Sequence, residues 1–268
     1  MKQQFELMPF ESAENELENF KQGSEIAVTT SPKLGVNRTV EFAEMVESRG
    51  FESIPHIASR YIEDEDHADQ LFQRLSEAGT NNVFIPAGDL EESRGPFDSS
   101  YKLLRFLNSN GFEFDHVGIT GYPEGHQFIS DEELWNSLDK KSQYADYIVT
   151  QICFDPEVIQ RWCEEVRDRG YNHDILVGVP GVIEMEKMVS IARKVGVGES
   201  LKFVRKTTGV MDFAKSLLGS KGRYKPSEVT DHFNSETSIH SGYHFYTFNR
   251  VQPTLDWVEE SGLDKRIR

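Results

Sequence analysis

The chain has 268 residues, and its 45 acidic and 29 basic residues give a formal net charge of −16. Nucleic acids and anionic membranes bind basic surfaces, so this excess of acidic residues argues against either as a partner. No segment approaches the ~20 apolar residues of a membrane span, and no basic, apolar leader precedes the first predicted strand, so we expect a soluble cytoplasmic protein.

Short apolar runs alternate with amphipathic segments along the whole chain. The runs are rich in Val, Ile, Phe and Tyr, which is typical of buried strands in a parallel sheet. We predict strands at 4–9, 25–31, 53–58, 82–89, 116–122, 147–154, 175–180 and 243–249. The segments between them have helical spacing, and several stop at a glycine, which can adopt the left-handed conformation that ends a helix. These glycines are Gly50, Gly79, Gly111, Gly170 and Gly196.

Strict alternation of strand and helix implies right-handed crossovers and a parallel sheet. Eight such units fit a (β/α)8 TIM barrel, an α/β fold of about 250 residues. We therefore predict a single barrel domain over 1–268, with a helical insertion at about 197–241 before the last strand. Polar residues that end the strands would then gather at the carboxyl ends, where barrel enzymes hold their active sites.

The insertion carries the main concentration of basic residues in this acidic chain, at 202–206 and 220–223. Loops on the catalytic side of a barrel often bind phosphate or close over substrate. An equally good interpretation is that the insertion forms two packing helices with solvated lysines and no role in binding. The second of these helices is expected to begin near Pro226.

Three polar residues at strand ends suggest chemistry. Glu6 lies between Phe5 and Leu7, and an apolar setting favours the protonated carboxyl group that a general acid needs, although a salt-bridged strand residue is as good an interpretation. Asp89 opens a loop where its carboxylate could accept paired hydrogen bonds from a heterocycle, or simply cap the loop. Gln151 lies in an apolar strand, so its amide needs a partner, either a ligand or a neighbouring backbone group.

Other catalytic and metal motifs are missing from the sequence. It contains no Rossmann or phosphate-binding glycine loop, no zinc spacing and no nucleophile elbow. Cys153 and Cys163 do not form a metal or redox motif, and we expect buried, inert thiols. His56 and His126 are isolated, and a lone histidine is more often a structural residue than a ligand. We therefore expect no metal, and a site built for a polar heterocycle and its cofactor.

The strand ends resemble those of the methylenetetrahydrofolate reductases. The resemblance covers seven strand ends in order and with matching spacing. Its motifs are FELMP at 5–9, VTT at 28–30, PH at 55–56, GD at 88–89, GYPEGH at 121–126, TQ at 150–151, FD at 154–155 and HFYTFNR at 244–250. The family fold is the barrel that the periodicity predicts independently.

The resemblance implies reduction of 5,10-methylenetetrahydrofolate to 5-methyltetrahydrofolate, an NAD(P)H-dependent oxidoreductase reaction of one-carbon metabolism and methionine biosynthesis. NADH or NADPH passes hydride to FAD and leaves, and the folate then takes its place, so the mechanism is ping-pong. Glu6 matches the general acid that protonates the folate nitrogen and opens its five-membered ring. Asp89 matches the carboxylate that binds the pterin and tunes the flavin, and Gln151 matches an amide that holds the pterin.

The same resemblance implies a set of residues that contact FAD in this flavoprotein family. Lys140 is the expected partner of the cofactor phosphates. The implied contacts are Thr29, His56, Gly88, Asp89, Tyr122, His126, Asn136, Lys140 and Tyr246.

Two positions depart from the family pattern. Ala87 stands where flavin-binding members commonly carry Arg, and Asp139 stands where they carry the first residue of an Arg-Lys pair. Charge-assisted hydrogen bonds are worth about 1.5 to 3 kcal/mol each, so FAD affinity would fall more than tenfold unless Lys141 or the 220 region compensates.

Three functions stay open for this chain. The first is the flavin-dependent reductase. The second keeps the folate site but transfers hydride directly from the nicotinamide, or runs in the oxidative direction. The third is a folate-binding partner subunit without redox activity. The resemblance also implies a homo-oligomer, while the sequence does not distinguish NADH from NADPH.

Overall fold

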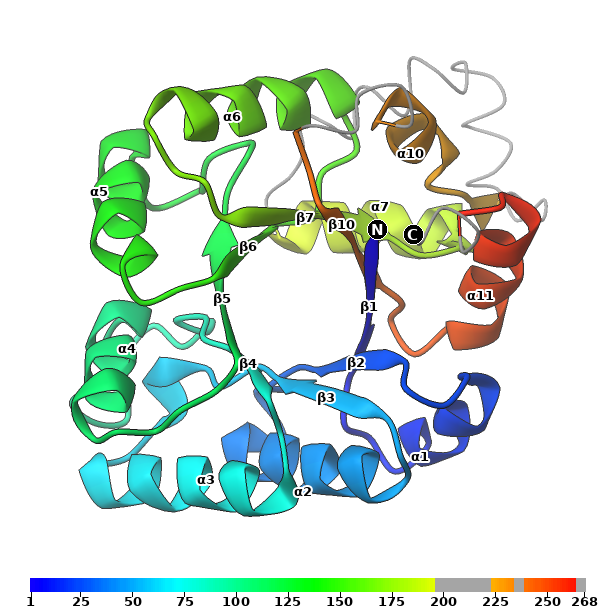
Figure 1. Cartoon of the computed structure of the whole chain (residues 1–268). Coiled ribbons are helices and arrows are strands. Elements are labelled where there is room, and N and C mark those ends of the chain that lie inside the picture. Colours follow the sequence, from blue (N-terminus) through cyan, green and yellow to red (C-terminus); the bar gives the residue numbers. More distant parts are fainter. Residues whose placement is uncertain (196–222, 234–238, 264–268) are drawn as a thin grey trace. The chain divides into compact units, whose positions relative to one another are not determined.

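The computed structural model describes residues 1–195, 223–233 and 239–263. Eight strands form one parallel sheet in the order β3-β2-β1-β10-β7-β6-β5-β4, and helices alternate with them along the chain (Figure 1). The strands are β1 Lys2–Leu7, β2 Glu25–Val28, β3 Glu52–Pro55, β4 Asn82–Phe84, β5 His116–Gly121, β6 Tyr147–Thr150, β7 Asp174–Pro180 and β10 Gly242–Tyr246.

The two strands at the ends of that order are themselves joined. His56 and Phe84 form a parallel bridge just beyond β3 and at the end of β4, and the Ile57 amide donates to the Phe84 carbonyl oxygen at 2.8 Å. Strand order, parallel pairing and alternation with helices are those of a (β/α)8 barrel, so the predicted fold class is confirmed.

The helices begin and end where the sequence supplies caps. Asp64 accepts a hydrogen bond from the His67 amide at the start of α3, and Gly79 ends that helix in the left-handed conformation;. Asp155 caps α6 in the same way, with Pro156 at its first position;. The α-helices are α1 Ala13–Glu16, α2 Gly35–Ser48, α3 Glu65–Ala78, α4 Ser100–Ser109, α5 Asp131–Ser142, α6 Pro156–Asp168, α7 Met185–Val195, α10 Ser227–Phe233 and α11 Val251–Glu260, with short 3-10 turns η1 Leu17–Asn19 and η2 Ser59–Tyr61.

The chain consists of two compact units. The N-terminal unit comprises Gln4–Thr120 and Trp135–Ile148. Within it, β1, β2 and β3 pair in parallel, with Glu6, Ala27 and Ile54 in register. Helices α2 and α3 lie side by side against these strands (Figure 1) and bury Phe42 and Phe72 completely.

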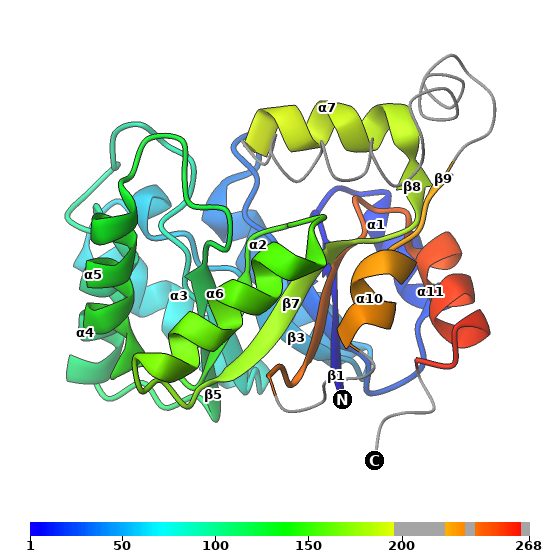
Figure 2. The same ribbon diagram turned by 90° about the horizontal axis from the view of Figure 1, so that it is seen from above.

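The C-terminal unit comprises Met1–Gln3, Gly121–Leu134 and the described part of Val149–Arg268. Here β7 and β10 pair in parallel, and a small antiparallel sheet forms from β8 Ile183–Glu184 and β9 Arg223–Tyr224. This sheet lies beside the start of α7 (Figure 2). Met185 and Met188 of α7 belong to a buried apolar cluster with Phe154 and Tyr224. The periodicity of the sequence did not predict the small sheet, because its strands have only two residues each.

Six of the eight strands are shorter than the predicted runs, and they end earlier at their carboxyl ends; β1 and β7 are not shorter. After β4 the chain stays bonded to the segment after β3, because the Pro86 and Ala87 carbonyl oxygens accept from the Ser59 and Arg60 amides of η2. Asp89 lies in the loop that follows, rather than at the end of a strand. Within the predicted insertion at 197–241, helix α10 begins at Ser227, as expected from Pro226. Residues 197–222, including the basic segment 202–206, lie outside the described residues, as does Gly196, so the insertion and the single domain stay predictions.

Candidate active site

Glu6 lies near the carboxyl end of β1, with a side chain that is 13% exposed. Its neighbours Phe5 and Leu7 are buried, and Ala27 is its register partner on β2. Oε2 of Glu6 lies 3.8 Å from Nδ1 of His56. The predicted acid therefore has little contact with solvent and faces an imidazole ring.

His56 follows β3 directly, and its backbone is fixed on both sides. Its amide donates to the Val28 carbonyl oxygen at 2.8 Å, and its own carbonyl oxygen accepts from the Thr30 hydroxyl at 2.6 Å. The Thr30 hydroxyl in turn lies 3.2 Å from that of Thr39 on α2. The imidazole packs on Phe84, with ring centroids 4.6 Å apart. These contacts hold the ring toward Glu6.

Thr29 follows β2 and shares this face of the sheet. It lies two residues beyond Ala27, the register partner of Glu6, and side chains two residues apart on a strand point the same way;. Its amide donates to the Leu7 carbonyl oxygen at 2.9 Å, which continues the β1–β2 pairing past the strand. The structure thus brings Glu6, Thr29 and His56 to one face of the N-terminal unit.

Gly88 and Asp89 form a second group in the same unit. Gly88 has φ +90°, and a Cβ added to it would lie 3.0 Å from the Tyr61 ring and 3.1 Å from Cβ of Ala58. The Tyr61 hydroxyl donates to Oδ1 of Asp89, and the Arg94 guanidinium lies 5.4 Å from the Tyr61 ring centroid. Burial and the hydrogen bond to Asp89 raise the pKa of Tyr61, so it remains a donor at neutral pH;.

Helix α5 carries the residues expected to meet the cofactor phosphates. Asn136 and Lys140 are exposed and lie four residues apart, which places them on one face of the helix;. Asp139 is exposed as well, whereas Lys141 is buried and its Nζ lies 3.5 Å from the Thr120 hydroxyl. Burial lowers the pKa of Lys141 to about 8. Lys141 is thus not an exposed cation like Lys140, because its side chain points into the protein.

Tyr122 and His126 meet on the loop that follows β5 in the C-terminal unit. Their rings pack edge to face with centroids 5.6 Å apart, and Phe128 packs on His126 at 6.0 Å. The Gly125 amide donates to the Tyr122 carbonyl oxygen at 3.1 Å, which closes the turn. Phe128 is 87% exposed, and the sequence reasoning did not single it out. The loop presents a row of aromatic rings.

Gln151 follows β6 and uses one end of its amide locally. Its Oε1 accepts from the Ile152 amide at 2.9 Å, and its backbone amide donates to the Gly121 carbonyl oxygen at 2.7 Å. The sequence left open whether a ligand or a neighbouring backbone group is the partner of this side chain. For the side-chain oxygen the partner is a backbone group, the Ile152 amide. The amide NH2 group keeps donors that can face a ligand.

Tyr246 ends β10 and is tied to β6. Its hydroxyl donates to the Thr150 carbonyl oxygen at 3.0 Å, and its ring packs on His244 at 4.9 Å. The hydroxyl proton is therefore used within the protein.

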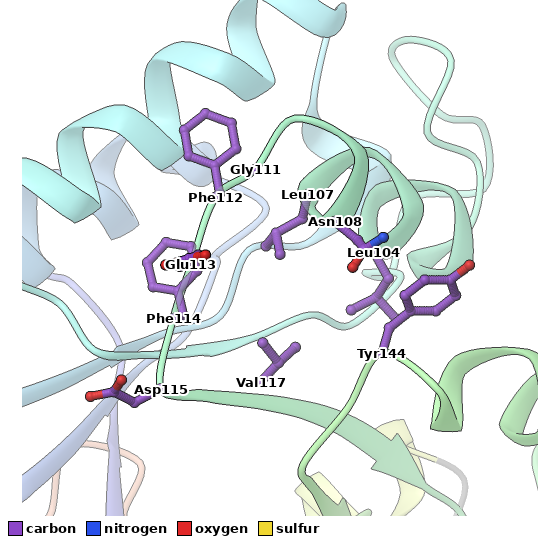
Figure 3. Close-up of a pocket in the computed structure, with 10 residues that line it drawn as sticks. All are labelled: Leu104, Leu107, Asn108, Gly111, Phe112, Glu113, Phe114, Asp115, Val117 and Tyr144. Carbon is purple, nitrogen blue, oxygen red and sulfur yellow. The ribbon is translucent and has the colours of Figure 1, made fainter.

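A pocket of about 470 Å³ lies in the N-terminal unit and is lined by no predicted site residue. Figure 3 shows the residues that line it. Leu104, Leu107, Phe114, Val117 and Tyr144 are among the side chains around it. It lies where β5 begins, whereas barrel enzymes carry their chemistry at the carboxyl ends of the strands. We do not assign the active site to it.

Cys153 and Cys163 are both buried, as predicted, and they do not form a disulfide with each other. Burial raises the pKa of the Cys163 thiol to about 12, so it stays protonated and inert;. Tyr61 could not be selected from the sequence, because it lies 28 residues from Asp89 and no local pattern links them.

Fold and strand-end residues together define a (β/α)8-barrel protein with a shielded carboxyl group beside an imidazole, and with polar and aromatic groups on the loops after its strands. The sequence model of methylenetetrahydrofolate reductase matches residues 15–262, and the chain belongs to this family. The match begins after Glu6, so the proposed role of Glu6 is supported by its sequence motif and by its position in the structure.

Three curated relatives illustrate the similarity. Methylenetetrahydrofolate reductase 1 of Schizosaccharomyces pombe is 26% identical over 73% of this chain and 33% of its own length. Methylenetetrahydrofolate reductase (NADH) 1 of Arabidopsis thaliana is 26% identical over 50% of this chain and 25% of its own. A probable methylenetetrahydrofolate reductase (NADPH) of Caenorhabditis elegans is 21% identical over 56% and 24%. The chain thus spans a third or less of the length of these relatives.

Within the described ranges, the helices are all too short or too polar to cross a membrane.

Proposed function

We propose that this chain reduces 5,10-methylenetetrahydrofolate to 5-methyltetrahydrofolate with NADH or NADPH, through FAD. The observation that supports this most is the shielded Glu6 carboxyl group beside His56, because the reaction needs one acid that is protected from water;. Family membership supports the substrate class, and relatives named for NADH and for NADPH leave the nicotinamide open.

Three side chains share the work on the folate. Glu6 donates its proton to the folate nitrogen, so that the five-membered ring opens and leaves an electrophilic carbon. Asp89 accepts hydrogen bonds from the pterin edge, and the Tyr61 hydroxyl on its Oδ1 fixes the plane of the carboxylate. The NH2 group of Gln151 donates to the pterin, while its oxygen is held by the Ile152 amide.

The residues present fit FAD in part. Gly88 lets the backbone approach where a Cβ would meet Tyr61, and Asn136 and Lys140 offer a donor and a cation on one exposed helix face;. The family resemblance also proposes Thr29, His56, Tyr122, His126 and Tyr246 as contacts. When bound, FAD would carry the hydride from the nicotinamide to the folate in two separate half-reactions.

One observation favours a second candidate, in which hydride passes from the nicotinamide to the folate without tightly bound FAD. Ala87 and Asp139 remove two cations that flavin-binding members carry, and Lys141 is buried. The described part of the chain therefore offers a weaker anchor for the diphosphate than the family pattern does.

An absorption spectrum and one assay separate these functions. Purified protein is scanned for flavin absorption, then assayed for NADH and NADPH oxidation with methylenetetrahydrofolate, with and without added FAD. Activity that depends on FAD supports the reductase. Activity of colourless protein without FAD supports direct transfer. Folate binding without turnover in any mixture would overturn both, in favour of a non-redox folate-binding subunit.

A further inference from the structure

We propose that His56 is a positioning residue for the Glu6 acid: its neutral imidazole donates from Nδ1 to one carboxyl oxygen of Glu6, so that the other oxygen carries the transferable proton. This inference rests on the proposed function and deepens it. The family resemblance assigns His56 only to contact with the flavin.

The three N-terminal strands place Glu6 and His56 on the same face of the sheet. Glu6 on β1, Ala27 on β2 and Ile54 on β3 are register partners, so their side chains share one face of the sheet;. His56 lies two residues beyond Ile54 and points to the same face. Ala27 between them has only a methyl group, and this short side chain allows the imidazole to reach across β2 to Glu6.

The imidazole is held for this role from three directions. The Val28 carbonyl oxygen and the Thr30 hydroxyl fix its backbone, and Phe84 supports its ring. Nδ1 lies 3.8 Å from the nearest carboxyl oxygen, slightly longer than a hydrogen bond. Catalytic hydrogen bonds are often long without substrate and tighten when it binds, and a small rotation of either side chain closes this gap.

His56 keeps the same protonation state before and after the proton leaves Glu6. In the protonated acid, Nδ1–H donates to the oxygen that carries no proton. After the proton has moved to the folate nitrogen, the same N–H donates to a carboxylate, and this bond is stronger because the acceptor is charged. The imidazole thus orients the proton beforehand and stabilises the carboxylate that its transfer leaves, so it accelerates ring opening rather than nicotinamide oxidation.

Three variants test the catalytic side of the proposal. His56→Leu removes the donor, His56→Asn keeps an amide nitrogen near the place of Nδ1, and His116→Leu is a control at an exposed histidine where β5 begins. A hydrogen bond to a charged group is worth about a 10- to 100-fold change in rate. We expect His56→Leu to lose that much in folate reduction while the nicotinamide step is nearly unchanged, and we expect His56→Asn to recover most of the loss. Equal loss in both steps, or no recovery with Asn, would overturn the proposal.

Ring-nitrogen NMR tests the pair independently of turnover. The chain has eight histidines, so the His56 signals are assigned by their loss in His56→Asn. We expect Nδ1 of His56 to carry the proton in the wild-type protein, and we expect Glu6→Leu, which lacks an acceptor, to shift that signal while the His116 signals stay in place. Unchanged His56 signals would overturn the pairing. If the wild-type protein reduces no folate, the proposed function fails, and this spectrum still decides whether the pair exists.

Discussion

The Tyr246 hydroxyl donates a hydrogen bond to the Thr150 carbonyl oxygen at 3.0 Å, at the end of β6. The Thr150 hydroxyl accepts from the Gly178 amide of β7 at 2.8 Å, so this one residue is bonded to both other strands. A Cβ added to Gly178 would lie only 2.1 Å from the Thr150 carbonyl oxygen. These contacts hold the three strands that lead to Gln151 and Tyr246.

Gly178→Ala should therefore destabilise the protein. The new methyl group meets backbone rather than a flexible side chain, and overpacking of this kind costs about 1 to 3 kcal/mol in the free energy of unfolding. Tyr246→Phe, which removes only the hydrogen bond, should cost about 1 kcal/mol. Urea denaturation measures both, with Ser190→Ala on the exposed face of α7 as a control. A Gly178→Ala protein as stable as wild type would show that β6 and β7 are not held as described.

Lys141→Met should stabilise the protein below pH 8. Burial lowers the pKa of Lys141 from 10.5 to about 8, so folding disfavours the charged form. The penalty is fully present below pH 8, at about 3 kcal/mol, and it disappears as the pH rises from 8 toward 10.5, where the unfolded chain also loses the proton. The variant should gain most at pH 7 and little at pH 10.5.

Lys140→Met is the matched control for this experiment. Lys140 is the neighbouring residue on α5 but is exposed, so its substitution should leave the dependence of stability on pH unchanged. Denaturation at pH 7, 9 and 10.5 gives the comparison. A Lys141→Met gain that does not fall with rising pH would mean that the buried charge is not its cause.

The sequence predicted the repeating architecture well, because the eight barrel strands and the helices between them follow from local periodicity and caps. Asp64 and Asp155 show this at helix starts, and Gly79 shows it at a helix end. Glu6 and Asp89 could be selected as carboxylates, but their partners could not. His56 lies 50 residues from Glu6, and Tyr61 lies 28 residues from Asp89. Such pairs depend on register between strands and on how a loop folds back, which local patterns do not encode. The burial of Lys141 was missed for the same reason, since Lys140 and Lys141 look alike in sequence.

Restoring the missing cation should strengthen FAD binding. Asp139 is exposed beside Lys140 on α5, so Asp139→Arg replaces a repulsive charge with a donor for the proposed diphosphate site. We expect FAD affinity to rise about tenfold or more, the value of a charge-assisted hydrogen bond. Quenching of flavin fluorescence measures the affinity. Glu77→Arg, at an exposed position of α3, makes the same change in net charge, and an equal gain there would attribute the effect to overall charge alone.

Asp89→Asn should weaken folate binding more than Tyr61→Phe does. The first change removes the carboxylate that accepts from the pterin, while the second removes only the hydroxyl that fixes its plane. Removing a hydrogen bond to a charged group costs about 1.5 to 3 kcal/mol, and an orienting bond costs less. Titration with methylenetetrahydrofolate in the absence of nicotinamide measures both, and unchanged affinity in Asp89→Asn would remove Asp89 from the site.

Glu6→Gln should separate the two half-reactions. Only folate reduction needs a proton from the protein, so the variant should oxidise the nicotinamide at nearly the wild-type rate and lose folate reduction almost completely. Gln keeps the size and the hydrogen bonding of the side chain, so the barrel should remain intact and folate should still bind. Rapid mixing follows each half-reaction alone, with FAD added to saturation. If both steps slow equally, Glu6 is structural, a salt-bridged strand residue rather than an acid. If only the folate step fails, Glu6 of β1 is the proton donor. Its burial between Phe5 and Leu7 and its position beside His56 then explain how the protein holds this proton.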